Sequence, residues 1–442
     1  MPTDVIADLE ARGTLKDLTH PDLGAQLTAG EPWTVYCGFD PTSDSLHIGN
    51  LVSLMALRRF QLAGHKVIAL VGGATGMIGD PSGRSEERNL LDEATLATNL
   101  VGLRNDIGRV LDLQGGDGIQ PAMVLNNADW VRPLSVIDFL RDVGKHFRVN
   151  VMIKQDSVRD RLEREEGISF TEFSYMLIQS YDFLHLFTEH GCRLQIGGSD
   201  QWGNITAGTE LIRRKLGEEA PQACGATLEL LLDNAGVKFG KSTGGGALWM
   251  NPSRTSPYRL YQHLLNTADA GDNPADQEVA RYLRVFTLLP VDEIAALMAE
   301  HNEARQQRAA QRRLAEEVVR MLHGDDGVTS AQQATEAIFG KADFASVPDA
   351  VLLGVFDDID LRAEFERSRL ADAGIPLIEA VAAAGLAKSK GEARKKLQEG
   401  AVTLNQQKVS DVNAALTADT TGGRGVCILG LGKQRRALVR FV

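Results

Sequence analysis

The sequence has few cysteines and no long apolar run. Its four cysteines are scattered over 442 residues and form no C-x-x-C pair. This spacing suggests neither a disulfide framework nor a zinc site, so we expect reduced thiols and no protein-bound metal. The longest apolar runs, such as Val67–Val71 and Leu228–Leu232, are far shorter than the roughly 18 residues that a membrane-spanning helix needs. A protein outside the membrane is therefore expected.

The first thirty residues lack the apolar block of a secretory signal peptide. They also lack the acid-poor composition of a transit peptide, because they carry Asp4, Asp8, Glu10, Asp17 and Asp22. The sequence therefore predicts a cytoplasmic protein.

Basic residues are concentrated near the C-terminus, although the whole chain has a net charge of -12. Residues 386–442 hold eleven Lys or Arg and four Asp or Glu, a local net charge of +7, which leaves -19 on residues 1–385. A basic tail on an acidic body predicts a separate module that binds an anion.

The length of the chain and its sequence patterns predict several domains. β-rich runs such as Trp33–Tyr36 and Lys66–Val71 alternate with helical segments such as Leu51–Leu62 and Phe173–Phe187. This alternation predicts an α/β domain with a mostly parallel sheet over residues 1–232.

The pattern changes after residue 232. A Gly-rich loop is expected over residues 233–250, and residues 325–372 fit a linker or a small helical subdomain. Between them, residues 251–324 predict an α-helical domain with helices at Gln277–Phe286, Val291–Glu300 and Glu303–Leu322.

The last segment, residues 373–442, has the pattern of a small α+β domain. Ser389-Lys390-Gly391-Glu392 has the spacing of a capping box, which would begin a basic helix. Ala401–Leu404 and Val426–Leu429 are predicted strands.

Two motifs nearly match known nucleotide-binding signatures. Gly73–Gly79 resembles the glycine fingerprint of short-chain dehydrogenases, but no tyrosine of this chain has the required lysine four residues on. Asp80-Pro81 would also interrupt the helix that holds a pyrophosphate. Gly236–Ser242 resembles a phosphate loop, but its glycines are one residue too close and no helix is predicted after it. Both signatures are therefore disfavoured.

A different pair of segments has the residues that ATP binding needs. His47–Asn50 (His-Ile-Gly-Asn) begins a predicted helix, where backbone donors and the helix dipole favour an anion. Far downstream, Lys238–Ser242 (Lys-Phe-Gly-Lys-Ser) places two lysines on the Gly-rich loop. These segments resemble the two signatures of class I aminoacyl-tRNA synthetases, which lie on the two halves of a Rossmann-like fold and close on ATP.

Both signatures depart from the usual class pattern. Asn50 stands where a second histidine is usual, so the side chain can donate a hydrogen bond but carries no charge. The downstream segment Lys238–Ser242 differs at its second and third positions but keeps both lysines, which are the groups that the chemistry requires.

Four further segments narrow the resemblance to the tyrosyl-tRNA synthetases: Ala74–Gly83, Asp138–His146, Ile168–Asp182 and Leu194–Asn204. The resemblance covers nearly the whole chain. It implies a Rossmann-like catalytic domain, an α-helical domain and a small α+β RNA-binding domain. It also implies a homodimer that activates L-tyrosine with ATP and Mg²⁺ and transfers it to tRNA(Tyr). The alternatives are the tryptophanyl enzymes, which share the fold, and an RNA-binding protein that has lost the activity.

One predicted helix carries polar residues on an otherwise apolar face. Tyr175, Gln179 and Asp182 are spaced i, i+4 and i+7, so they lie on the same side of the helix. Buried polar groups need partners, which could be a satisfied network between helices or a small polar ligand.

The resemblance implies a role for each matching residue. Tyrosine would be bound by Tyr36, Asp80, Asn127, Tyr175, Gln179, Asp182, Gln195 and Gln201, with Tyr36 and Asp182 at its phenol hydroxyl. ATP would be bound by Cys37, Gly38, Asp40, Gly49, Asn50, Gly198, Asp200, Lys238 and Lys241. The leaving pyrophosphate would be stabilised by Thr42, His47, Lys238, Lys241, Arg84 and Arg88.

The basic tail resembles a small RNA-binding module that is also found in a ribosomal small-subunit protein. The resemblance implies tRNA phosphate contacts for Lys388, Lys390, Arg394, Lys395 and Lys396. A solvated helix face is the alternative. The module's usual Asn-Gly turn is replaced here by Asn405-Gln406, which leaves the geometry of the hairpin open.

Overall fold

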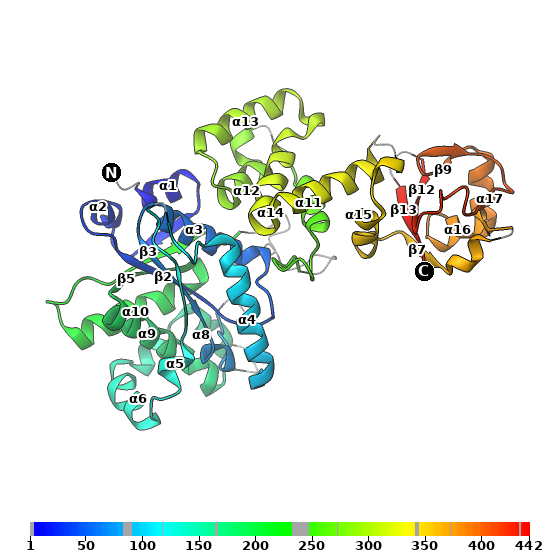
Figure 1. Cartoon of the computed structure of the whole chain (residues 1–442). Coiled ribbons are helices and arrows are strands. Elements are labelled where there is room, and N and C mark those ends of the chain that lie inside the picture. Colours follow the sequence, from blue (N-terminus) through cyan, green and yellow to red (C-terminus); the bar gives the residue numbers. More distant parts are fainter. Residues whose placement is uncertain are drawn as a thin grey trace. The chain divides into compact units, whose positions relative to one another are not determined.

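The computed structural model describes residues 4–82, 91–116, 118–163, 167–231, 247–271, 273–340, 344–371, 373–432 and 435–442. The chain divides into two compact units (Figure 1). One unit contains the residues up to Arg254 together with Thr267–Leu314, and the other contains Thr255–Asn266 and Ala315–Val442. Within these described ranges, no helix is long and apolar enough to cross a membrane.

A central sheet of six strands forms the middle of the first unit, in the order β1-β6-β5-β2-β3-β4 (Figure 1). All neighbouring strands run parallel except β1, which is antiparallel to β6. The predicted, mostly parallel sheet is therefore confirmed. The strand bounds are Leu15–Leu18 (β1), Thr34–Phe39 (β2), Lys66–Val71 (β3), Met123–Asn126 (β4), Cys192–Gly198 (β5) and Cys224–Leu228 (β6).

Helices cover both faces of this sheet. The side chains of Val67–Val71 in β3 are all buried, although successive side chains of a strand point to opposite faces. Burial on both faces is typical of parallel strands. The longer helices that contact the strands are α3 (Leu51–Leu62), α4 (Glu93–Val110), α9 (Phe170–His190) and α10 (Trp202–Leu216). The shorter helices of this unit are α1 (Val5–Ala11), α2 (Leu23–Thr28), α5 (Ala128–Val131), α6 (Val136–Asp142), α7 (Val149–Met152) and α8 (Asp156–Leu162).

Helix α9 is three residues longer at each end than the predicted Phe173–Phe187. The Ser169 hydroxyl accepts a hydrogen bond from the Glu172 amide and caps the first turn. Gly191, with φ 60°, ends the helix in the left-handed conformation. The apolar periodicity located the helix, and these two caps set its length.

The predicted helical region is present, with one boundary to correct. Helices α12 (Glu278–Phe286) and α13 (Val291–Glu303) match two predictions closely. The third helix, expected to begin at Glu303, instead begins at Ala309, because α13 continues to Glu303 and a 3-10 turn over Arg305–Gln307 follows.

Helix α14 (Ala309–Phe339) crosses the expected boundary at residue 324. Gly324 interrupts its helical geometry with φ 72°, which is a conformation that favours glycine. The following segment is more than a linker, because strand β7 (Arg362–Phe365) pairs in parallel with β13 (Arg435–Phe441). The C-terminal sheet therefore starts before the expected residue 373.

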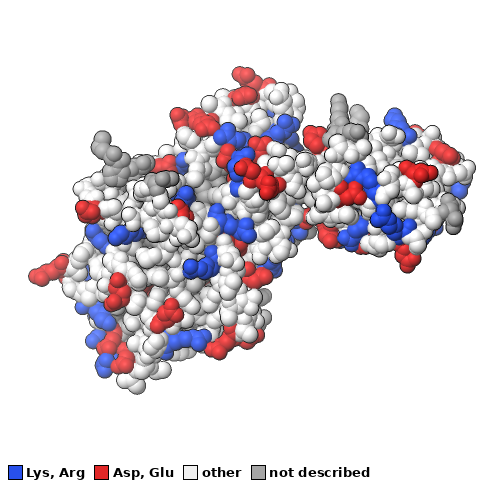
Figure 2. Space-filling view, in the orientation of Figure 1, with Lys and Arg blue, Asp and Glu red and all other residues white. Residues whose placement is uncertain are grey.

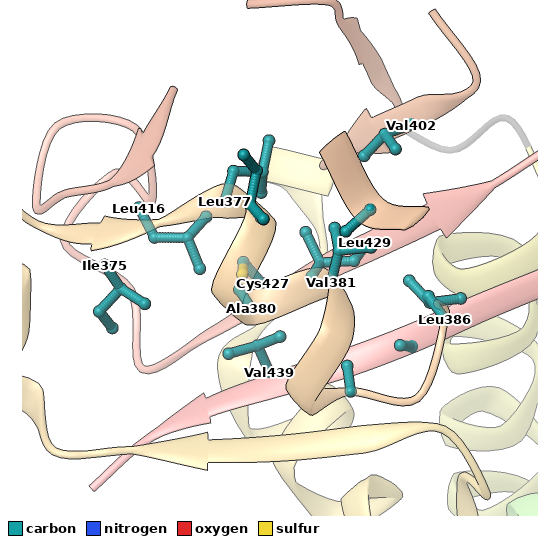
Figure 3. Close-up of a cluster of buried hydrophobic side chains, with 14 of the residues drawn as sticks. Ile375, Leu377, Ala380, Val381, Leu386, Val402, Leu416, Cys427, Leu429 and Val439 are labelled. Atoms are coloured by element: carbon teal, nitrogen blue, oxygen red, sulfur yellow. The ribbon is translucent and has the colours of Figure 1, made fainter. Parts of the chain in front are cut away.

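The C-terminal part of the second unit is the predicted α+β domain. Its sheet has the order β10-β9-β12-β13-β7, in which β9 is Val402–Leu404, β10 is Gln407–Val409 and β12 is Val426–Leu431. A smaller pair joins β8 (Ile375–Pro376) to β11 (Ala415–Leu416). Figure 3 shows how the apolar side chains of α16 (Leu377–Ala383) pack on those of the sheet, and α17 (Lys390–Gln398) adds two more. α11 (Pro257–Leu265) and α15 (Asp349–Gly354) also belong to this unit.

The hairpin between β9 and β10 keeps a tight turn without glycine. Asn405 and Gln406 have φ 46° and 69°, as a two-residue type I′ hairpin turn requires. The Asn405 side chain compensates by accepting a hydrogen bond from the Ile428 amide at 2.9 Å. The expected capping box is shifted: Ser389 caps the Glu392 amide, but Glu392 bonds the amide of Lys388 rather than that of Ser389.

A buried ion pair holds the start of α9 against α8. Arg161 donates two hydrogen bonds to the Glu172 carboxylate, at 3.2 and 3.0 Å, and both side chains are almost completely buried. Since α9 carries Tyr175, Gln179 and Asp182, this pair fixes the helix that contributes most to the expected site.

We expect Glu172→Ala to lower the free energy of unfolding by roughly 3–5 kcal/mol, because it leaves the Arg161 guanidinium buried without its counter-ion. Chemical denaturation would measure the change. Asp142→Ala, which breaks the exposed pair with Arg141, is the matched control and should change the stability far less, because water screens this pair. The double variant Arg161→Met/Glu172→Leu should recover most of the loss; an equal loss in the double variant would contradict this account.

Candidate active site

A cavity of about 290 Å³ lies at the carboxyl ends of the central strands. β2, β3, β5 and the residues that follow β4 and β6 all contribute to its lining. Every predicted tyrosine- or ATP-site residue that the structure describes lines it: Tyr36, Cys37, Gly38, Asp40, Thr42, His47, Gly49, Asn50, Asp80, Asn127, Tyr175, Gln179, Asp182, Gln195, Gly198, Asp200 and Gln201. Arg84, Arg88, Lys238 and Lys241 lie outside the described residues.

A buried carboxylate lies on one wall of the cavity. Asp182 accepts hydrogen bonds from Asn127 Nδ2 at 2.9 Å and from Trp130 Nε1 at 2.8 Å, one at each oxygen. Burial raises the pKa of Asp182 to about 7. The hydroxyl of Tyr36, also buried, has no hydrogen-bond partner among the described residues, and neither has the side-chain oxygen of Gln195.

The polar face of α9 both makes a network and lines the cavity. Tyr175 donates to Asp40 at 3.0 Å, Gln179 donates to Gln201 at 3.3 Å, and Gln201 donates to Asp80 at 2.7 Å. All three polar residues on this face therefore have side-chain partners, as the network interpretation expects. The same three residues line the cavity, as the ligand interpretation expects.

Asp40 and Asp80 make this part of the cavity acidic. Asp40 also accepts a hydrogen bond from Thr75 at 2.8 Å. Burial raises the pKa of Asp80, and the nearby charge of Asp40 raises it further. A cationic ligand group beside these carboxylates would be stabilised, because opposite charges attract strongly where water is excluded.

The other part of the cavity is formed by the segment that begins α3. The Asn50 side-chain oxygen accepts a hydrogen bond from the His47 amide at 3.2 Å, so this asparagine caps the turn that precedes α3. Cys37 and Gly198 lie nearby at the ends of β2 and β5. Burial raises the pKa of Cys37 to about 12, so its sulfur stays a neutral thiol.

The glycines of Gly73–Gly79, which resembled a dehydrogenase fingerprint, have a packing role in this fold. A Cβ on Gly73 would lie 2.1 Å from the side-chain oxygen of Asn126, and one on Gly76 would lie 2.9 Å from Pro41. These glycines leave room for neighbouring side chains, which agrees with rejecting the dehydrogenase interpretation. Gly72 does the same for Asp40, whose carboxylate oxygen would be 2.2 Å from an added Cβ.

Several residues of the site were not identified from the sequence. Trp130 holds Asp182, Thr75 links Asp40 to Asn127, and Asn204 donates to Gln201 at 3.1 Å. Ser45, Ser82 and Trp249 also line the cavity. No periodic pattern marks these positions, because they come from separate loops and helices. Within the described chain, no three His, Cys, Asp or Glu side chains converge to hold a metal.

Comparisons with known proteins identify the family of this chain. The family model for class I tRNA synthetases (W and Y) matches residues 28–340, and the model for the tyrosine–tRNA ligase SYY-like C-terminal domain matches residues 360–439. The tyrosine–tRNA ligase of Bacillus caldotenax is 46% identical over 99% of this chain and 100% of its own length. The tyrosine–tRNA ligase of Opitutus terrae is 46% identical with the same coverage.

Among solved structures, a C-terminally truncated mitochondrial tyrosyl-tRNA synthetase from Aspergillus nidulans is similar, with a TM-score of 0.66 and 29% identity. The match covers 76% of this chain and 94% of that chain. With the full-length identity to the bacterial relatives, these matches decide the family. The chain belongs to the class I tRNA synthetases of the tryptophan and tyrosine group, and within that group to the tyrosine–tRNA ligases.

Proposed function

We propose that this tyrosine–tRNA ligase binds L-tyrosine with its phenol hydroxyl between Asp182 and Tyr36. A phenol hydroxyl can donate one hydrogen bond and accept another. It would donate to the Asp182 carboxylate and accept from the Tyr36 hydroxyl, which otherwise has no partner among the described residues. The indole N–H of tryptophan can only donate, so it would leave Tyr36 unsatisfied. The buried Tyr36 hydroxyl without a described partner is the observation that supports tyrosine over tryptophan.

The acidic part of the cavity would bind the α-ammonium group of the amino acid. Asp80 and Asp40 supply negative charge there, and Tyr175 and Gln179 supply polar contacts. Gln195, whose buried side-chain oxygen has no described partner, would complete the tyrosine pocket with Gln201 and Asn127.

ATP would occupy the part of the cavity near His47. Cys37, Gly198 and Asp200 would contact the ribose, and Thr42, His47 and Asn50 would lie beside the phosphates. The described lining contains no Lys or Arg, so cations for the triphosphate would come with ATP as Mg²⁺ and from the segments that contain Arg84, Arg88, Lys238 and Lys241. The tyrosine carboxylate would attack the α-phosphorus, and these cations would stabilise the charge that develops on the departing pyrophosphate.

The C-terminal domain would bind tRNA(Tyr). Lys388, Lys390, Arg394 and Lys395 are exposed around α17, and Lys396 is partly exposed. Figure 2 shows Lys and Arg side chains on the visible face of this domain, together with acidic ones. A local charge of +7 beside a body of -19 would concentrate tRNA phosphates at this domain.

A homodimer would explain an exposed apolar surface on the catalytic unit. Val136, Ile137, Val149, Val151 and Phe170 are between 54% and 77% exposed. These residues belong to α6, α7 and α9, and such surfaces usually mark sites of protein–protein contact. The cytoplasm, where bacterial tRNA is charged, is the proposed location.

ATP–pyrophosphate exchange tests the proposed function. Exchange that depends on tyrosine, followed by transfer of labelled tyrosine to tRNA(Tyr), is the expected result. Exchange supported by tryptophan, or by no amino acid, would contradict it.

Tyrosine affinity should depend on the ionisation of Asp182. Burial raises the pKa of this carboxyl to about 7, and a bound phenol that donates to the ionised form would lower it. Affinity should therefore weaken as the pH falls below about 7, by up to about tenfold per pH unit. Equilibrium dialysis between pH 5.5 and 8 would measure the change.

Two variants separate Asp182 from its neighbour in this experiment. Asp182→Asn should bind tyrosine roughly 10- to 100-fold more weakly, because a hydrogen bond to a charged group is lost, and should remove the pH dependence. Tyr36→Phe should lose less affinity and keep the pH dependence. The same pH dependence in Asp182→Asn would show that another group is responsible.

The loop lysines should act on the reaction rather than on tyrosine binding. Lys238→Ala and Lys241→Ala should slow formation of tyrosyl-adenylate in single-turnover experiments, because their charge is needed mainly in the transition state. Tyrosine affinity should stay near the wild-type value. A loss of tyrosine affinity without a slower reaction would contradict this role.

Replacing Arg394, Lys395 and Lys396 together with Ala should weaken tRNA binding and flatten its salt dependence. Each lost phosphate contact should reduce the slope of log K against log salt by about 0.7–0.9. A control that removes the same charge from this domain is the triple Ala variant of Arg362, Arg367 and Arg369, which contact Asp357, the Gly423 carbonyl and Glu379. Equal slopes in the two variants would mean that net charge, rather than the α17 surface, binds tRNA.

A further inference from the structure

Helix α4 contacts the catalytic His47 segment through one stripe of residues. Asn99 donates to the Pro41 carbonyl at 2.9 Å, and a Cβ on Gly102 would lie 1.8 Å from the Asp44 carbonyl. Asp106, one turn further on, accepts from the Leu46 amide at 2.9 Å. The i, i+3, i+7 spacing puts all three on one face of α4, which therefore supports the chain from Pro41 to Leu46.

Asp106 is the most buried polar member of this stripe. It is 1% exposed, and the same oxygen that accepts from the Leu46 amide also accepts from the Ser45 hydroxyl at 2.6 Å. Its other oxygen lies 3.4 Å from Arg109. A buried carboxylate is costly unless it is hydrogen-bonded, so these contacts strongly favour one position of Ser45 and Leu46.

Ser45 connects this carboxylate to a second segment of the cavity wall. While its hydroxyl donates to Asp106, its oxygen accepts from the Asn251 amide at 3.1 Å. Backbone hydrogen bonds continue the connection, because Ile48 donates to the Leu248 carbonyl and Met250 donates to the Leu46 carbonyl. His47 and Trp249 face each other in this short antiparallel bridge, and both line the cavity.

We propose that Asp106 is a positioning residue for tyrosyl-adenylate formation. Through its hydrogen bonds with Ser45 and the Leu46 amide, it holds His47 and Trp249 in position at the ATP end of the cavity. Asp106 does not itself line the cavity, so it acts through the segments that it holds. The tyrosine contacts come from other elements, chiefly Asp182 on α9 and Tyr36 on β2. Loss of the Asp106 contacts should therefore affect ATP and leave tyrosine binding unchanged.

Ser45→Ala and Asp106→Asn test this proposal. The assay is tyrosine-dependent adenylate formation, so the proposal rests on the proposed function. Each variant should lower kcat/KM for ATP by about 10- to 100-fold, as expected when reacting groups move by about 1 Å. The tyrosine dissociation constant should stay within about twofold. Ser45→Thr keeps the hydroxyl and should recover most of the rate. The double variant should be no slower than the slower single variant, because the two side chains act as one unit.

Ser256→Ala is the matched control, because Ser256 also donates its hydroxyl to an aspartate, Asp358, in the other unit. It should leave adenylate formation unchanged. Wild-type rates in both Ser45→Ala and Asp106→Asn would overturn the proposal. So would a parallel loss of tyrosine affinity, or an equal loss of rate in the control, since either would indicate a general effect on stability. If the wild-type protein forms no adenylate, the proposed function fails instead.

Discussion

The position of β2 in the sheet determines where this protein can place a ligand. The chain passes from β2 through α3 to β3 on one side, whereas β5 and then β6 lie on the other. Parallel crossovers are right-handed, so the connecting helices of the two halves fall on opposite faces of the sheet. A crevice opens at the carboxyl ends of the strands where the direction of winding reverses, and the cavity lies there.

The cavity has two parts, and they differ in the charge of the side chains that line them. One part contains the carboxylates of Asp182, Asp40 and Asp80, each of which is hydrogen-bonded by neighbouring side chains. These bonds reduce the cost of burying the three carboxylates. If ATP binds next to this acidic wall, as we propose, its triphosphate needs cations to offset the repulsion between negative charges.

The His47 segment shows how a surface loop becomes a precise part of such a site. Its backbone is held by Asp106 and Ser45 on one side and by residues 248–251 on the other. Arg254 adds a contact at the edge, with its guanidinium 3.9 Å from the centre of the Trp249 ring and 2.6 Å from Asp44. Loops that carry chemistry depend on rigid elements of this kind, because small displacements of reacting groups are costly.

The sequence alone determined the fold class and placed three polar residues on one helix face. The alternation of β-rich and helical runs predicted the parallel sheet, since periodicity reflects which faces are buried. The i, i+4, i+7 spacing placed Tyr175, Gln179 and Asp182 on one face of α9, because side chains at these intervals point to the same side of any α-helix. The excess of basic residues after residue 386 located the C-terminal module, because charge composition can be read directly from the sequence.

The tertiary structure decided which residues hold that site in place. Trp130 and Asn127 meet at Asp182 from separate positions after β4, and Asp106 meets Ser45 across 61 residues of chain. Such pairs leave no periodic mark, because they depend on the path of the loops that bring distant segments together. For the same reason the sequence misplaced the start of the C-terminal sheet. The parallel pairing of β7 with β13 joins residues 76 positions apart, such as Arg362 and Leu438, and no local pattern encodes that contact.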